Sequence, residues 1–100
     1  MAPTRSPAAD ASAVDCHRLV VEAEPGANML LRLLEPFVIH DVLPVRTHGA
    51  ADADGLRVDV TFRAPAALAL RLHGRLAAIV GVRAARLEPV QAGDARVKAA

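Results

Sequence analysis

The clearest pattern in the chain is an alternation of apolar and polar residues over 56–63, LRVDVTFR. The apolar positions are Leu56, Val58, Val60 and Phe62. Because successive side chains of a strand point to opposite faces, this pattern predicts a strand with one buried and one solvated face. Segment 16–23, CHRLVVEA, predicts another strand, which stops before Pro25 and Gly26. It would place four residues on one face: His17, Leu19, Val21 and Ala23.

Two other segments carry apolar residues at helical spacing. The stripe in 28–38 consists of Met29, Leu30, Leu33, Leu34 and Phe37. We expect Asn28 to cap this helix and Pro36 to bend or end it near its last turn. The stripe in 65–80 consists of Leu68, Leu72, Leu76 and Ile79. Pro65 suits the first position of that helix, and Gly81 suits its C-terminal cap.

Two further strands complete the prediction. Segment 41–48, DVLPVRTH, reads as an edge strand, because Pro44 cannot donate to a central ladder. A turn over 49–55 follows it, and 82–90 forms the last strand. The order β-α-β-β-α-β, with one half-solvated strand, predicts an α+β ferredoxin-like sandwich. This fold has a four-stranded antiparallel sheet with two helices on one face.

The chain has 100 residues, which suits a single domain over 15–91. Residues 1–14 and 92–100 are rich in small and polar residues, so we predict a disordered N-terminal tail and a flexible C-terminal tail. The N-terminal segment lacks the apolar run of a secretory signal, and no apolar stretch approaches the length of a membrane span. The single cysteine, Cys16, excludes an internal disulfide. We therefore expect a cytoplasmic protein without a membrane partner.

Composition argues against nucleic acid as a partner. Twelve Lys and Arg against eleven Asp and Glu give a formal charge of +1, and the basic residues are scattered. Phe37 and Phe62 are the only aromatic residues besides the histidines, so stacking platforms for single strands are missing.

Candidate catalytic and metal-binding residues are few. Four histidines, His17, His40, His48 and His73, lack the spacing of familiar metal sites. No Ser or Cys stands beside His40 and Asp41 as an evident nucleophile, and Cys16 reads as a small structural residue. The loop 24–28 has neither the phosphate-binding Arg that acylphosphatase-like enzymes of this topology need there nor the Cys-x-x-Cys that metal-carrying domains need. We expect no cofactor, no metal site and no catalytic activity, and a small enzyme is the least favoured interpretation.

The chain resembles the ACT family of amino-acid-sensing regulatory domains over about residues 17–88. A first strand runs through a Pro-Gly loop into a helix that begins Asn28-Met29-Leu30-Leu31-Arg32. A hairpin then leads to the helix of Leu68, Leu72, Leu76 and Ile79, and Gly81-Val82 opens the last strand. Within the family, the small regulatory subunit of acetolactate synthase, in its single-ACT form, is the most similar in length and organisation.

The resemblance implies a small amino acid as ligand, with branched-chain types favoured, and a homodimer that pairs through an edge strand such as 41–48. It also implies a separate, large catalytic subunit as partner. The expected ligand-binding residues are Gly26, Ala27, Asn28, Met29 and Leu30. A helix N-terminus there would meet the carboxylate, and Gly26 would let backbone approach the ligand.

Asn28 stands where the family usually has glycine, with Gly26 two residues early. Either the loop is reshaped, or the effector pocket is altered or lost. The loop could equally be a plain turn and cap, which would leave a dimerisation or subunit-docking module without a ligand. Four residues, Arg46, Arg57, Asp59 and Arg63, should lie on the polar face of the hairpin, either as a solvated face with ion pairs or in contact with a larger enzyme subunit.

Overall fold

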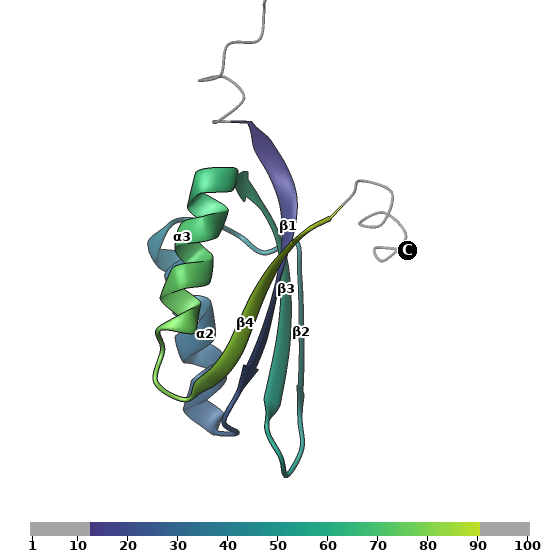
Figure 1. Ribbon diagram of the computed structural model, residues 1–100, viewed down its shortest axis with the longest axis vertical. Helices are drawn as coiled ribbons and strands as arrows, with labels where there is room; N and C mark the ends of the chain where they lie inside the picture. The colour runs from purple at the N-terminus through teal and green to yellow at the C-terminus, as the bar shows by residue number, and fades with distance from the viewer. Residues whose placement is uncertain (1–12, 91–100) are drawn as a thin grey trace, which may run out of the picture.

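The computed structural model describes residues 13–90, so the predicted tails at 1–14 and 92–100 lie almost entirely outside the described residues. The elements are β1 (Val14–Ala23), α2 (Ala27–Ile39), β2 (Arg46–Ala51), β3 (Leu56–Pro65), α3 (Ala66–Ala77) and β4 (Val82–Pro89). The strands form one antiparallel sheet in the order β2-β3-β1-β4, and both helices lie on the same side of it (Figure 1). The predicted ferredoxin-like βαββαβ arrangement is confirmed.

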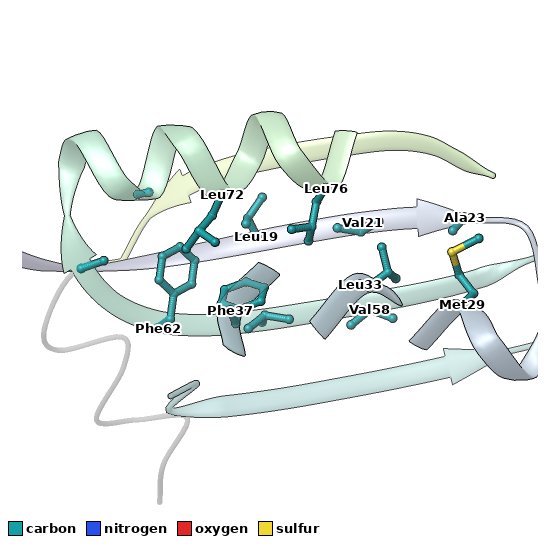
Figure 2. Packing of buried hydrophobic residues seen from close by; sticks show 13 residues of the cluster. Leu19, Val21, Ala23, Met29, Leu33, Phe37, Val58, Phe62, Leu72 and Leu76 are labelled. Atoms are coloured by element: carbon teal, nitrogen blue, oxygen red, sulfur yellow. The ribbon is translucent and has the colours of Figure 1, made fainter. Parts of the chain in front are cut away.

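The core lies between the helices and the central strands. Leu19 pairs with Val60 and Val21 with Val58, so the apolar positions predicted on β1 and β3 share the helix-facing side. Buried residues of both helices close over them: Met29, Leu33, Phe37, Ala69, Leu72 and Leu76. Phe37 meets Phe62 edge-to-face with ring centroids 5.2 Å apart (Figure 2). Apart from these two phenylalanines, the buried core consists of aliphatic side chains and Met29.

Helix α2 differs from its prediction at both ends. It begins at Ala27 with Gly26 as N-cap, and no side chain among residues 13–90 makes a capping hydrogen bond there. Asn28 is the second helical residue and is exposed, so its prediction as the cap is wrong. Pro36 is buried inside the helix, which continues to Ile39. Pro36 cannot donate a hydrogen bond to the carbonyl of Arg32, and because it lies in the last turn, only three helical residues follow this break.

Strand β2 lies later in the chain than predicted. Residues 41–45 are the connection from α2, in which Asp41 has a positive φ of 57° and the Val42 N–H donates to the Phe37 carbonyl at 2.8 Å. The strand starts only after Pro44, at Arg46, and takes up Gly49, Ala50 and Ala51 from the predicted turn. The turn shrinks to 52–55, where the Asp52 side chain accepts the N–H groups of Asp54 and Gly55 at 2.8 and 3.0 Å. The predicted edge position is correct.

Helix α3 is shorter than predicted. Pro65 is its N-cap, and Ala78, not Gly81, is its C-cap. Leu72 and Leu76 are buried, whereas Leu68 and Ile79 pack at the margin of the core. Neither helix within residues 13–90 is long and apolar enough to cross a membrane.

No helix in the described part of the chain covers the other side of the sheet (Figure 1), which we call the uncovered face. At its centre, Arg18 of β1 donates to Asp59 of β3 at 2.6 Å. Burial alone would raise the pKa of the Asp59 carboxyl, but the hydrogen bond from Arg18 and the positive charges of Arg18 and Arg57 outweigh burial. They hold this pKa below its ordinary value. The pair therefore stabilises the fold while Asp59 is ionised.

We expect this stabilisation to depend on pH. It is fully present above the pKa of an unfolded aspartate, about 3.9, and is lost as the pH falls through the lower folded value. Replacing Asp59 with Asn should lower the unfolding free energy by about 1 kcal/mol at pH 7. In urea titrations at pH 7, 5, 4 and 3, the difference between the two proteins should shrink with falling pH. A difference that stays constant would show that the pair does not act through ionisation.

Candidate functional site

The loop between β1 and α2 is the first candidate site. The chain leaves β1 at Ala23 and enters α2 at Ala27, and all of 24–28 is exposed. Gly26 is extended, with φ 174° and ψ 142°, and its carbonyl accepts the Met29 N–H at 3.1 Å. The first turn of α2 therefore presents the N–H groups of Ala27 and Asn28 without a side-chain cap from residues 13–90. An anion can bind such a helix start.

The structure brings four of the five predicted ligand-binding residues to this surface. Gly26, Ala27, Asn28 and Leu30 are exposed. Met29 instead points into the core beside Ala23 (Figure 2) and is buried. A ligand at the loop would contact Met29 through its backbone, whereas the side chain of Leu30 is available.

Gly81 fixes the position of this loop. The Glu24 N–H donates to the Gly81 carbonyl at 2.8 Å, so the turn before β4 is bonded to the end of β1. Gly81 has a φ of +99°, and a Cβ on it would lie 2.6 Å from the Cε of Met29. The backbone conformation therefore favours glycine, whereas the Met29 methyl, at the end of a flexible side chain, could move aside. The sequence suggested a helix cap and the opening of the last strand for Gly81, but not this contact with the loop.

Arg83 links the loop to the β2–β3 turn. Its Nη1 donates to the Asp54 carbonyl at 2.6 Å, and its Nε lies 3.7 Å from a carboxylate oxygen of Glu24. Gly55 leaves room for the guanidinium, since a Cβ there would lie 2.8 Å from Nη1. An open groove of about 330 Å³ runs along this end of the sheet. Its lining residues include Glu22, Asp52, Asp54, Arg57 and Arg83, but none of the predicted ligand-binding residues.

Strand β2 provides a second feature, an uncovered edge. All six of its residues are exposed. The Asp52 N–H donates to the Gly55 carbonyl at 2.9 Å, and hydrogen-bonded pairs alternate along an antiparallel ladder. The even-numbered residues of β2 therefore direct their backbone groups toward β3. Thr47, Gly49 and Ala51 present theirs at the free edge, with small side chains that do not obstruct another strand.

Helix α2 carries a second apolar stripe. One flank of the helix, at helical spacing, consists of Ala27, Leu31, Leu34 and Val38, without a charged residue. Leu31 and Val38 are exposed and Leu34 is half-buried. Glu35 follows Leu31 by one helical turn and, with Arg32, lines the groove against α3. The stripe lies between Glu35 and the core-facing residues of the helix, and it was missed in the sequence because the core stripe overlaps it at Leu34.

The histidines and the cysteine are the remaining candidate catalytic or metal-binding residues. His17 is buried on the helix-facing side, where its Nε2 lies 3.0 Å from the Ala64 carbonyl, and the Nε2 of His73 lies 2.9 Å from the Ala85 carbonyl. Among residues 13–90, no three His, Cys, Asp or Glu side chains are grouped so that they could hold a metal ion. Cys16 is a half-buried free thiol on β1.

Comparison with known proteins identifies the architecture. No family model and no curated protein sequence matches the chain. Among solved structures, it is similar to the ACT domain of GTP pyrophosphokinase from Chlorobium tepidum, with 10% identity and a TM-score of 0.67 over 78% of this chain and 90% of that one. An uncharacterised protein from Thermotoga maritima matches at 14% identity and a TM-score of 0.65, over 79% of this chain and all of that one.

The regulatory subunit of aspartate kinase from Thermus flavus also matches, at 16% identity and a TM-score of 0.52, over 79% of this chain and 56% of that one. At such low identities the likeness concerns the fold. Two of these three neighbours carry the names of an ACT domain and of a regulatory subunit. The chain therefore has the ACT-like fold that its sequence resembles.

Proposed function

We propose that this chain is a non-catalytic regulatory domain that forms a dimer and binds a small amino acid at the seam between its two copies. The dimer would regulate a separate catalytic subunit. The sequence resemblance suggests that this subunit belongs to an enzyme of the acetolactate synthase type. One observation carries the proposal. The start of α2, which has no side-chain cap from residues 13–90, lies at the end of the sheet where the exposed edge strand β2 also ends. Ala23, Leu56 and Ala51 occupy one row of the sheet there, and α2 begins immediately after it.

Antiparallel pairing of β2 with β2 of a second copy would complete this arrangement. A two-fold axis near Gly49 would bring the start of one β2 beside the end of the other. The connection before β2 in the second copy would then approach the start of α2 in the first. Leu43, 87% exposed in the single chain, lies in that connection. Across the same seam the flanks of the two α2 helices would cover each other, with Leu31 of one facing Val38 of the other.

The proposed ligand follows from the groups at the loop. Its carboxylate would accept the N–H groups of Ala27 and Asn28, where the helix dipole favours a negative charge. Its ammonium would lie within reach of acceptors on Glu24 and Asn28. An aliphatic side chain would contact Leu30 and the second copy's Leu43. The names of the ACT and aspartate kinase neighbours agree with a regulatory role.

A thermal-shift screen of the twenty amino acids tests the sensing proposal. We expect at least one small aliphatic amino acid to raise the melting temperature, because a ligand that binds only the folded state stabilises it, by about 2.7 kcal/mol at 100 times its Kd. Replacing Asn28 with Asp should abolish the shift, since it places a carboxylate beside that of the ligand.

A matched control is Ala67→Asp, because Ala67 is the second residue of α3 as Asn28 is of α2. A carboxylate in the first turn favours either helix, so neither substitution should destabilise the protein without ligand. The Ala67 variant should keep the shift. If none of the twenty amino acids raises the melting temperature of the original chain, the sensing proposal is wrong. The alternative, a dimerisation or subunit-docking module without a ligand, would then be favoured.

A further inference from the structure

The uncovered face of the sheet carries most of the positive charge of the described chain. By the strand registers, its basic residues are Arg18, Arg46, Arg57, Arg63 and Arg86, and its acidic residues are Glu22, Asp59 and Glu88. Five arginines against three carboxylates leave an excess of two positive charges. Residues 13–90 contain nine Arg and nine Asp or Glu in total, so the rest of the described chain carries an excess of two negative charges. Most of these other carboxylates lie in the loops, at Glu24, Asp41, Asp52 and Asp54, whereas the two helices carry Arg32, Arg71 and Arg75 against Glu35.

The centre of this face is closely packed although no other part of residues 13–90 covers it. Val20 is 2% exposed although it points away from the helices, because the side chains around it close over it. Arg18 is held by Asp59 at 2.6 Å and lies 3.7 Å from Glu88. Arg57 and Arg86 stand at the margin, 3.3 and 3.2 Å from the same two carboxylates, and Arg63 is exposed. A partner would therefore meet three arginines that carboxylates of the face already hold, Arg18, Arg57 and Arg86, which reduces the entropy lost on binding.

Three kinds of occupant can be compared. Single-stranded nucleic acid is disfavoured, since both phenylalanines are buried on the opposite side of the sheet and the face offers no aromatic platform. A second copy stacked face to face would bring two positive excesses together. A carboxylate-rich protein surface suits the face best, because the planar guanidinium groups can bind carboxylates with two parallel hydrogen bonds.

We propose that the uncovered face is a docking surface for an acidic patch on a partner protein. The surface is distinct from the β2 edge and from the loop before α2. It would therefore remain accessible in the dimer, with or without a bound amino acid. The proposal does not depend on ligand sensing and can hold where sensing fails.

Photo-crosslinking of the full chain in the cells that produce it tests this docking. The photoreactive residue p-benzoylphenylalanine replaces Ala84, which is exposed on the uncovered face in β4, or, as a control, Ala67, which is exposed on α3. We expect adducts from position 84 with another protein, joined at a segment that has more carboxylates than basic residues. Charge reversal by Arg63→Glu with Arg86→Glu should lower the adduct yield about tenfold or more. The matched pair Arg71→Glu with Arg75→Glu, on α3, should leave it unchanged.

Circular dichroism and melting temperatures establish that both charge-reversed variants are folded. Adducts from position 84 with a second copy alone would assign the face to self-association instead. Adducts with RNA, equal yields from positions 84 and 67, or no adduct from either position would each overturn the proposal. So would an adduct yield from position 84 that does not change in the Arg63 and Arg86 variant.

Discussion

Replacing Phe62 with Ala is expected to lower the free energy of unfolding by about 3–5 kcal/mol. Phe62 is fully buried at the centre of the core, between Phe37 and the ring of His17, whose centroid is 5.5 Å away. The substitution removes both ring contacts and leaves a cavity among short aliphatic side chains that cannot move in to fill it. A domain of this size has little stability in reserve, so a large fraction of the variant should be unfolded at room temperature.

Urea unfolding followed by circular dichroism measures this effect, since the chain has no Trp or Tyr for fluorescence. Phe62→Leu keeps most of the volume and should give an intermediate stability, which remains measurable if the alanine variant does not fold. Val80→Ala serves as the surface control, since Val80 is 80% exposed, and should change the stability by less than about 0.5 kcal/mol. Equal losses for the leucine and alanine variants would contradict a cavity as the cause.

Replacing Val38 with Glu is expected to raise the dissociation constant of the proposed dimer about 100-fold. A two-fold interface contains the substitution twice, and each copy would bury a carboxylate without a partner, at a cost of about 1–3 kcal/mol. The control is Val80→Glu in the turn before β4, because Val80 and Val38 are similarly exposed, at 80% and 76%. Sedimentation over a range of concentrations should show weaker association for the first variant alone. Equal association of both variants would place the dimer contact elsewhere on the surface.

The fold was predictable because its central strands and core helices carry strong periodic patterns. Val58, Val60 and Phe62 alternate with polar residues, and Leu72 and Leu76 recur one helical turn apart, so local sequence and burial agree at these positions. Strand β2 has no such pattern. Both of its faces are exposed, so no alternation marks Thr47, Gly49 or Ala51, and only pairing with β3 makes them a strand.

The candidate site was predictable only in part, because much of it is formed by residues distant in sequence. The position of the loop near residues 26–30 follows from the break between strand and helix. The bond between Glu24 and Gly81 and the link from Arg83 to Asp54 span 57 and 29 residues, and no local pattern reports them. The burial of Met29 depends on the same long-range packing, because the turn at Gly81 lies directly against its side chain.

The central place of the first strand has a consequence for how the protein is made. β1 is synthesised before every other element, yet it pairs with β3 on one side and β4 on the other. During translation its apolar residues stay without their strand partners until residues up to Pro89 have left the ribosome. Closing these long loops delays folding and leaves the nascent strand open to pairing with other chains. The charged residues of β1, Asp15, Arg18 and Glu22, would then help to keep the unfinished chain from aggregating.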